Sequence, residues 1–597
     1  MTSKLINRRD LDFVLYELLD VDRLCERPRY TDHSRETFTA ALDTAEKIAE
    51  DKFATHNRKA DLNEPHFDGQ RVHMIPEVKE ALAAFIDAGF MAAGQDYDYG
   101  GMQLPHVMAL ACNGIFKAAN VGTAGYPFLT IGNANLLLAH GSREQIDRYV
   151  RPELEGRFFG TMCLSEPQAG SSLADIRTTA TPQPDGSYRI VGTKMWISGG
   201  DHELSENIVH LVLARIQGAP AGVKGISLFI VPRYRVNDDG SRGPRNDVAL
   251  AGLNHKMGYR GTVNTFLSFG EKGDCYAELV GEPHKGLSYM FHMMNEARIG
   301  VGFGAAMLGY TGYLHALDYA RNRPQGRPLG AKDPTTPQVP ITEHADVRRM
   351  LLAQKAYAEG GLALCLYAGR LVDEERTGEA DEARRRAHAL LDLLTPVVKS
   401  WPSQWCLEAN SLAIQVHGGY GYTREYPVEQ FYRDNRLNPI HEGTFGIQAL
   451  DLLGRKAVMD GGAALAELAK DMTATIADTP AELAAEAAAL GAALADADAT
   501  LRVLVPVMAK DPALALANAA AFLEAFGHTV VAWLWLRMAA AATRALPSAQ
   551  GEDGNFYRGK IAACRWFFRW ELPKTRAWHQ LLRSLDDTCI TTDPAWL

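Results

Sequence analysis

Three segments of this sequence combine side chains that could perform chemistry, and the most reactive group lies in the last of them. Residues 438–456, NPIHEGTFGIQALDLLGRK, place the carboxylate of Glu442 in a short loop before a helix that opens at Gly443 and Thr444. Apolar neighbours would partly desolvate this carboxylate, and desolvation raises a carboxyl pKa towards the range in which the group works as a general base. The alternative is an ordinary glutamate at a helix N-terminus, stabilised by the helix dipole.

The other two segments offer binding surfaces rather than reactive groups. In residues 162–177, MCLSEPQAGSSLADIR, the backbone N–H groups and hydroxyls around Gly170 suit a phosphate or the polar edge of a flavin, or else satisfy the turn of the loop itself. In residues 194–202, KMWISGGDH, Trp196 presents a flat stacking face beside the hydroxyl of Ser198, unless this tryptophan closes a core at the end of a strand. Each segment alone leaves both interpretations open.

Composition limits the class of protein that carries these segments. The chain has 597 residues, which suggests about four structural units, and its 47% hydrophobic and 22% charged residues are typical of a globular protein. Its net charge of −10 gives no global attraction to nucleic acid or to an anionic bilayer. The eight cysteines include no CxxC pair, which excludes a zinc knuckle and a dithiol motif and fits a reducing compartment. Residues 1–20 carry charges where a signal peptide needs an apolar core, so we expect a cytoplasmic protein.

The spacing of apolar residues predicts the elements that must position the three segments. Helical spacing holds over residues 1–158, with clear cases at 77–90 and 143–156, and a period of two then predicts antiparallel strands between about 160 and 283. The helical period returns from 286 to about 457, and Ala-rich helices follow to the end. The best strand candidates are 188–198, 207–216 and 225–234, the clearest long helix is 346–371, and 325–341 is a loop rich in Pro and Gly.

One predicted helix, residues 519–542, is long and apolar enough to be considered as a membrane span. Glu524, His528 and Arg537 interrupt it, and ionisable groups are expensive in lipid, so we expect a buried bundle helix instead.

In this order, the three segments resemble the acyl-CoA dehydrogenase family. Further matches are DYGGMQLP (98–105), HKMGYRGT (255–262), NEARIGVGFGAAMLG (295–309) and QVHGGYGY (415–422), and the resemblance covers about residues 36–457. The C-terminal part also resembles a bacterial subgroup with a helical extension, which acts on 3-(methylthio)propanoyl-CoA or on fatty acyl-CoAs. The resemblance implies an α+β fold, the acyl-CoA dehydrogenase fold. Its expected parts are an N-terminal extension (1–35), an N-terminal helical domain (36–158), a central antiparallel β domain (159–283), a C-terminal four-helix bundle (284–457) and an appended helical domain (458–597).

The same resemblance implies a noncovalent FAD cofactor. Trp196 would shield one face of the isoalloxazine ring and Ser198 would bond the ring near N5, while Arg323 would reach the ADP part of a FAD housed in a neighbouring subunit. The implied FAD-binding residues are Met162, Leu164, Ser165, Gly170, Ser171, Trp196, Ile197, Ser198, Arg323, Gln325, Gln415, Gly418, Gly419, Thr444 and Gly446. The implied acyl-CoA contacts are Ser171, Asn295, Arg298 and Gly443. Two positions depart from the family pattern, because Gly326-Arg327 replaces a Phe-Gly pair and Gly446 replaces a Gln.

The family places its catalytic base at one of two positions. One is the glutamate of the xEGT loop, here Glu442, and the other is the residue immediately before Arg298 on the first bundle helix. That second position holds Ala297, and Glu296 lies one step of about 100° further back on the helix. We therefore expect Glu442 to be the catalytic base and Glu296 to be a solvated or structural residue.

The implied reaction is the α,β-dehydrogenation of an acyl-CoA to the trans-2-enoyl-CoA, a step of fatty acid β-oxidation. Glu442 would remove the α-proton while the β-hydrogen leaves as hydride to flavin N5, and the backbone N–H of Glu442 with a ribityl hydroxyl would stabilise the enolate. Electrons would pass to an electron-transfer flavoprotein, and no metal is required. Two alternatives remain: an oxidase that uses oxygen, and a non-catalytic flavoprotein that binds nucleic acid.

The region after residue 457 carries 12 Lys and Arg against 16 Asp and Glu, which argues against a nucleic-acid-binding extension. Residues 564–583 mix three tryptophans with six basic residues, and we expect them to pack on the bundle or on a partner subunit rather than on a membrane surface. Because the neighbouring subunit would hold the ADP end of each FAD, we expect a homodimer. The appended helices would then cover the face through which family dimers pair into tetramers.

Overall fold

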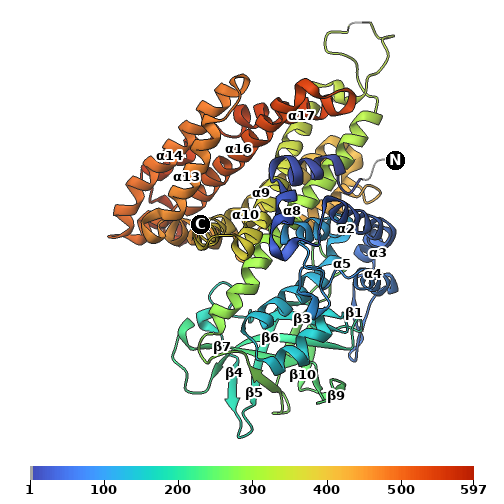
Figure 1. Ribbon diagram of the computed structural model, residues 1–597, viewed down its shortest axis with the longest axis vertical. Helices are drawn as coiled ribbons and strands as arrows, with labels where there is room; N and C mark the ends of the chain where they lie inside the picture. The colour runs from blue at the N-terminus through green and yellow to red at the C-terminus, as the bar shows by residue number, and fades with distance from the viewer. Residues whose placement is uncertain (1–3, 332) are drawn as a thin grey trace. The chain divides into compact units, whose positions relative to one another are not determined.

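The computed structural model describes residues 4–331 and 333–597, and these separate into two compact units. The β-containing unit comprises His33–Gly300, and the helical unit combines Met1–Asp32 with Val301–Leu597. The boundary between them falls inside one long helix, α8 (Gly286–Asn322), drawn in light green in Figure 1.

A long, buried helix, α5 (His106–His140), forms the centre of the helical layer in the β-containing unit. It bends at Asn120, whose backbone is non-helical (φ −162°, ψ 91°) and whose side chain accepts a hydrogen bond from the N–H of Thr123 at 3.0 Å. The helix predicted over 77–90 is confirmed as α4, and the segment predicted over 143–156 forms two short helices around a π turn. The other bounds are α2 (Arg35–Ile48), α3 (Asn57–Leu62), α4 (Pro76–Asp87), α6 (Arg143–Gln145), η7 (Ile146–Val150) and α7 (Arg151–Leu154).

Eight of the described strands form the main sheet of this unit, in the order β10-β11-β5-β12-β7-β6-β3, with β4 paired to β5 and β6. The strands predicted over 188–198 and 207–216 are confirmed as β5 and β6, and the third candidate divides into β7 and β8. Most neighbours are antiparallel, as predicted, but β3 and β4 each run parallel to β6, because a period of two identifies a strand without identifying its partner. The bounds are β1 (His66–Phe67), β2 (Val72–His73), β3 (Phe158–Cys163), β4 (Thr179–Pro182), β5 (Tyr188–Ser198), β6 (Asn207–Ile216), β7 (Ile226–Pro232), β8 (Tyr234–Val236), β9 (Arg242–Arg245), β10 (Val248–Leu253), β11 (Asn264–Phe269) and β12 (Tyr276–Leu279).

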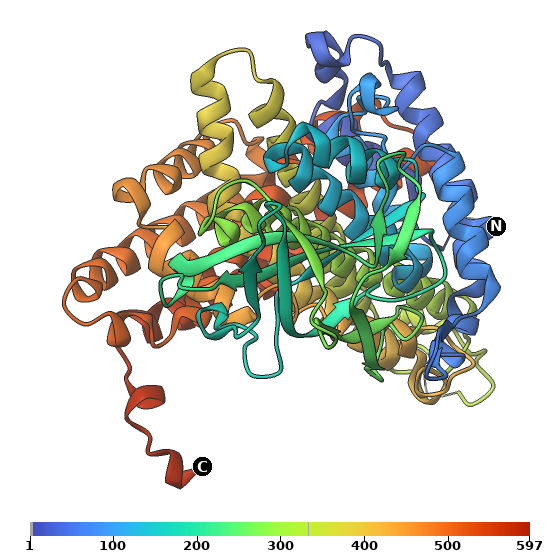
Figure 2. The ribbon, with the colours of Figure 1, turned by 90° about the horizontal axis from the view of Figure 1, so that it is seen from below.

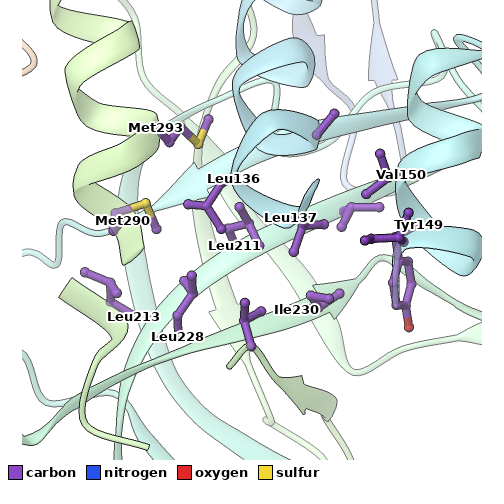
Figure 3. Close-up of a cluster of buried hydrophobic side chains, with 14 of the residues drawn as sticks. Leu136, Leu137, Tyr149, Val150, Leu211, Leu213, Leu228, Ile230, Met290 and Met293 are labelled. Atoms are coloured by element: carbon purple, nitrogen blue, oxygen red, sulfur yellow. The ribbon is translucent and has the colours of Figure 1, made fainter. Parts of the chain in front are cut away.

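The main core of the β-containing unit lies between the sheet and the helices that cover one face of it (Figure 3). Strand β6 is buried on both faces: Leu211 and Leu213 point into this core, while Val212 belongs to a second cluster on the opposite side. A strand buried on both faces needs a continuous apolar run, which is what residues 207–216 provide. The labelled core residues in Figure 3 are Leu136, Leu137, Tyr149, Val150, Leu211, Leu213, Leu228, Ile230, Met290 and Met293.

The helical unit is built on two long antiparallel helices, α9 (Ala345–Thr377) and α10 (Asp381–His417), against which the second half of α8 packs. Close approach of α8 to α10 depends on glycine: a Cβ at Gly302 would overlap the carbonyl oxygen of Val398, and one at Gly309 would lie 2.6 Å from the Cβ of Cys406. The shorter α11 (Val428–Asn435) and α12 (Phe445–Asp451) follow. The helix predicted over 346–371 is confirmed as the main part of α9.

The appended helices cover one face of this bundle, because α16 packs against α9, α10 and α12 as well as against its own neighbours α17 and α18 (Figure 1). Among the described residues, one helix is long and apolar enough to span a membrane, Ala519–Ser548, and 83% of its most apolar window is buried. The last residues, after α18, extend away from the other appended helices (Figure 2). The bounds are α13 (Ala463–Ala477), α14 (Ala484–Met508), α15 (Pro512–Leu516), α16 (Ala519–Ala545), α17 (Gly551–Trp570), α18 (Lys574–Arg583) and α19 (Thr588–Thr591).

The Trp- and Arg-rich stretch 564–583 spans the end of α17 and all of α18. Trp566 is buried, whereas Trp570 is 54% exposed. Arg569 and Arg576 are also exposed, so these two arginines point outward, while Trp566 and the basic His579 pack inward.

The N-terminal segment, α1 (Arg8–Asp12) followed by the π turn η1 (Phe13–Leu18), is part of the helical unit. Its Asp10 is buried, accepts a hydrogen bond from the hydroxyl of Tyr310 at 2.6 Å and pairs with Lys560 of α17. Lys560 also pairs with Glu359 of α9 at 2.7 Å. This buried ion cluster therefore joins the N-terminal segment, the bundle and the appended helices.

Candidate functional site

The candidate site residues fall into two groups, one in each unit. In the β-containing unit, the loop after β3 is held by a buried ion pair between Glu166 and Lys194 of β5, at 2.9 Å. The carboxylate of Glu166 also accepts hydrogen bonds from the hydroxyl of Thr178 at 2.6 Å and the N–H of Arg177 at 2.7 Å. Lys194 donates a second hydrogen bond to the carbonyl of Leu164 at 2.9 Å. The loop that carries Met162 to Ser171 is thereby fastened to the strand that carries Trp196.

Burial and charge act in opposite directions on this ion pair. Burial raises the pKa of Glu166, but the Lys194 ammonium and the hydrogen bonds to the carboxylate outweigh that effect and lower this pKa to about 2. Burial is the largest influence on Lys194 and lowers its pKa. Glu166 is therefore ionised at neutral pH and depends on Lys194 for its counter-charge.

Trp196 lies at a β-bulge in β5 with its backbone in the left-handed region (φ +66°). The register of β5 against β11 shifts between Thr265 and Leu267, so that two residues of β5 face one of β11. The bulge turns the indole outward, and Trp196 is 58% exposed. The alternative of a tryptophan that closes a core is wrong, because the structure leaves this ring open for stacking.

The other predicted residues of this unit surround the bulge and the loop. The hydroxyl oxygen of Ser198 accepts a hydrogen bond from the side-chain amide of Asn264 at 3.1 Å, and Gly170 and Ser171 are exposed. Ile197 is buried in the second core cluster, so it can reach a ligand only through its backbone. Met162, Leu164 and Ser165 are half-buried beside the loop.

The start of α8 carries the predicted acyl-CoA contacts and the rejected base. Arg298 is buried and donates to the side-chain oxygen of Asn295 at 3.4 Å. Glu296 accepts a hydrogen bond from Asn135 of α5 at 2.8 Å. Ala297 is buried, as its position on the adjacent face of the helix requires. Glu296 thus has a structural hydrogen-bond role in the β-containing unit.

In the helical unit, Glu442 occupies a loop whose backbone is strained. Its φ is +56° and that of Gly443 is +87°, and a left-handed glutamate is uncommon outside functional sites. Two side chains hold this backbone: Gln448 donates to the carbonyl of Glu442 at 3.0 Å, and Lys399 donates to the carbonyl of Gly443 at 2.6 Å. Thr444 is the N-cap of α12 and accepts a hydrogen bond from the N–H of Ile447.

This geometry argues against the alternative that Glu442 is an ordinary glutamate of a helix N-terminus, stabilised by the helix dipole. Glu442 precedes the N-cap Thr444 by two residues and has a non-helical backbone, so it does not lie in the first turn of α12. Its side chain is half-buried, as a base that works in a partly desolvated site requires. Gly446 lies in the first turn of α12 with open space around its Cα.

A chain of hydrogen-bonded asparagine side chains holds the same loop through His441. His441 bonds to the side-chain oxygen of Asn438 at 3.0 Å, Asn438 donates to Asn435 at 2.9 Å, and Asn435 donates to Asn410 at 2.7 Å. Sequence reasoning missed these residues together with Lys399. The signal in the sequence is weak: two asparagines three residues apart precede Pro439, and their partner lies on another helix.

The residues expected to hold the ADP part of FAD form a second cluster in the helical unit. Arg323 donates to the side chain of Gln325 at 3.3 Å, and its guanidinium lies 5.7 Å from the ring centroid of Tyr420 in the 3₁₀ turn η11 (Gly418–Tyr422). Gly418 and Gly419 in this turn, and Gln415 just before it, are exposed. The structure thus brings together two groups that are far apart in the sequence.

The departure from the family pattern after Gln325 has a structural reason. Gly326 has a φ of +69°, and a Cβ there would lie 3.1 Å from the ring of His344. Arg327 donates to the carbonyl of Thr336 at 2.6 Å and so holds the loop that follows. A phenylalanine at position 326 would be strained, and the glycine allows the tight return of the chain.

Four family models match the chain in sequence order. They are the acyl-CoA dehydrogenase N-terminal domain (35–157), the middle domain (161–271), the C-terminal domain (284–458) and the acetyl-CoA dehydrogenase C-terminal-like domain (468–593). The fold therefore comprises the three domains of an acyl-CoA dehydrogenase and an extra C-terminal domain.

Full-length relatives and solved structures agree with this assignment. The chain is 37% identical to 3-methylmercaptopropionyl-CoA dehydrogenase of Ruegeria pomeroyi over 98% of both chains, and 36% identical to the broad-specificity linear acyl-CoA dehydrogenase FadE5 of Mycobacterium tuberculosis over 99% of both. Its fold is similar to that of an acyl-CoA dehydrogenase from Bacillus anthracis solved with FAD, with a TM-score of 0.74, 20% identity and coverage of 95% and 93% of the two chains. The chain belongs to the acyl-CoA dehydrogenase family and is an oxidoreductase.

Proposed function

We propose that this protein catalyses the α,β-dehydrogenation of an acyl-CoA thioester to the trans-2-enoyl-CoA, with Glu442 as the catalytic base. The observation that carries the proposal is the backbone of Glu442, left-handed and held at two successive carbonyls by Gln448 and Lys399. Strain of this kind persists where the surroundings over-determine it, and it is common at active sites.

The residues present fit an FAD cofactor. The exposed indole of Trp196 offers a stacking face, the hydroxyl of Ser198 offers a polar contact for the ring edge, and Arg323 offers a charge for a phosphate. Family members bind FAD, and one structurally similar protein was solved with it. When bound, FAD supplies the acceptor of the hydride.

The chain's own residues carry the proton chemistry. The carboxylate of Glu442 would accept the proton from the α-carbon, and the N–H of the same residue would donate to the thioester oxygen, where negative charge develops. Ser171, Asn295, Arg298 and Gly443 would contact the acyl-CoA.

Relatives narrow the substrate class. By name, they act on 3-methylmercaptopropionyl-CoA, on linear acyl-CoAs and, at 33% identity, on butyryl-CoA in Syntrophomonas wolfei. We therefore propose a short or medium acyl-CoA as the substrate. One relative, 26% identical over 63% of this chain, is named as a subunit of a caffeyl-CoA reductase–Etf complex, which supports an electron-transfer flavoprotein as the electron acceptor.

We propose a homodimer on the basis of the ADP cluster of the helical unit. If Arg323 and the η11 turn serve the FAD of a neighbouring subunit, two-fold symmetry completes both sites at once. The appended helices already cover one face of the bundle, which supports a dimer that does not pair further. Light scattering of the FAD-loaded protein tests this arrangement: a stable monomer with full FAD content would contradict the shared site, and a tetramer would contradict the blocking role of the appended helices.

The test of the function itself compares two carboxylates. Glu442→Gln should keep FAD and acyl-CoA binding but lose turnover by roughly 10³-fold or more, because the proton acceptor is gone. The matched control Glu296→Gln should change turnover little, since its hydrogen bond to Asn135 is structural. The assay uses a series of acyl-CoAs, including thioether members, with an artificial electron acceptor. Loss of activity in the Glu296 variant alone would refute the choice of base, and hydrogen peroxide as the main reduced product would indicate an oxidase.

A further inference from the structure

Lys399 is a fully buried lysine in the middle of α10, and the mechanism described above does not use it. Its side chain has no solvent exposure, and Nζ donates a hydrogen bond of 2.6 Å to the carbonyl oxygen of Gly443. An ammonium group is costly to bury unless it is bonded to a partner. One partner of Lys399 is therefore the residue immediately after Glu442.

The loop that receives this bond needs support. Glu442 and Gly443 are both left-handed, and a non-glycine residue in that region is strained. Their two carbonyls are held from different elements, the first by Gln448 of α12 and the second by Lys399 of α10. The two donors differ in kind: Gln448 donates from a neutral amide, whereas Lys399 donates from an amine that carries a positive charge when it is protonated.

We propose that Lys399 is a positioning residue for the dehydrogenation, which holds Glu442 in its left-handed conformation and places its amine, positively charged when protonated, against the carbonyl of the next residue, Gly443. This inference rests on the proposed function and specifies how the base is controlled. A cation near a carboxylate favours its ionised form, so we expect a protonated Lys399 to favour the form of Glu442 that accepts a proton.

Other charged groups near the loop belong to ion pairs or hydrogen bonds of their own. Asp434 of α11 accepts from Gln430 at 3.5 Å, and the pairs Arg433–Glu429, Arg455–Asp451 and Lys456–Asp392 lie on or beside α11, α12 and the π turn η12 (Leu452–Lys456). Within the loop itself, His441 bonds to Asn438. Lys399 bonds directly to the backbone of the Glu442–Gly443 segment.

The experiment separates the hydrogen bond from the charge with three variants. Lys399→Met removes both, Lys399→Gln keeps a donor without charge, and Gln448→Met removes a neutral donor to the same loop. Each holoenzyme is measured for the pH dependence of turnover and for amide hydrogen exchange over residues 440–447. Thermal unfolding checks the fold, and Lys399→Gln serves if Lys399→Met does not fold.

The positioning role predicts faster exchange of the loop in Lys399→Met and in Gln448→Met. If the charge of Lys399 acts on Glu442, the acid limb of the pH profile moves upward by about one unit in both Lys399 variants, because each of them removes the cation. The acid limb stays in place in Gln448→Met, which removes only a neutral donor. Unchanged exchange and an unchanged pH profile in Lys399→Met would overturn the inference, as would an equal shift in Gln448→Met. A wild-type enzyme without activity on any acyl-CoA would instead overturn the proposed function, so the two failures are distinguishable.

Discussion

Replacing Lys194 with methionine should loosen the loop that carries the predicted FAD contacts of the β-containing unit. The substitution keeps most of the side chain's volume but leaves the Glu166 carboxylate, whose side chain is 2% exposed, without its counter-charge. Breaking a buried ion pair by removing one partner typically costs about 3–5 kcal/mol. The double variant Lys194→Met/Glu166→Gln should recover most of this loss, because no uncompensated charge remains buried.

The pKa of Glu166 shows how the stability contributed by its ionised form depends on pH. Its fall from the usual 4.5 to about 2 corresponds to roughly 3 kcal/mol of stability at neutral pH, the net effect of burial, of Lys194 and of the hydrogen bonds from Thr178 and Arg177. Because the folded-state pKa is the lower one, this contribution is fully present above pH 4.5 and is lost as the pH falls towards 2. The difference in stability between wild type and Lys194→Met should therefore be largest near neutral pH and shrink in acid.

Amide hydrogen exchange of β5 at neutral pH measures the effect where it occurs. A local loss of about 3 kcal/mol corresponds to exchange roughly 100-fold faster in β5 and in the adjoining loop, while β7, which does not pair with β5, serves as an internal reference. FAD content after dialysis gives a second measurement, and we expect it to fall in the single variant. If the single variant kept wild-type exchange, or if the double variant were no better than the single one, the ion pair would not be what fastens the loop.

Two further predictions concern the helical unit. Arg323→Ala should weaken FAD binding by about 1.5–3 kcal/mol, because a charge-assisted contact to phosphate is lost. The FAD content of the dialysed protein measures this effect, and full retention would contradict the proposed contact of the Arg323–Tyr420 cluster with the ADP part of FAD. Gly443→Ala should reduce turnover at least tenfold, because φ is +87° and the added Cβ would lie 2.5 Å from Nε2 of Gln448. Steady-state kinetics of the folded variant measure the reduction, and wild-type turnover would show that the loop tolerates displacement.

Local patterns were sufficient to predict much of the fold. The helix at α4 and the strands β5 and β6 follow from the spacing of apolar residues, which is a property of each segment alone. The parallel pairing of β3 and β4 with β6 could not be predicted in this way, since strand direction depends on how distant segments meet. The inclusion of the N-terminal segment in the helical unit could not be predicted either, because it depends on Asp10 and Glu359 both pairing with Lys560, hundreds of residues away in the sequence.

The candidate site divides in the same manner. The sequence by itself identified the candidate base, Glu442, and the candidate stacking residue, Trp196, because the ordered set of motifs resembles one family, although each segment alone left a second interpretation open. Only the tertiary structure decided that a β-bulge exposes Trp196 and that Lys399 and Gln448 hold the loop of Glu442. These features depend on long-range contacts between side chains and backbone. Nothing in the sequence around Lys399 marks it as a supporting residue, because its carbonyl partner, Gly443, lies in a loop elsewhere in the chain.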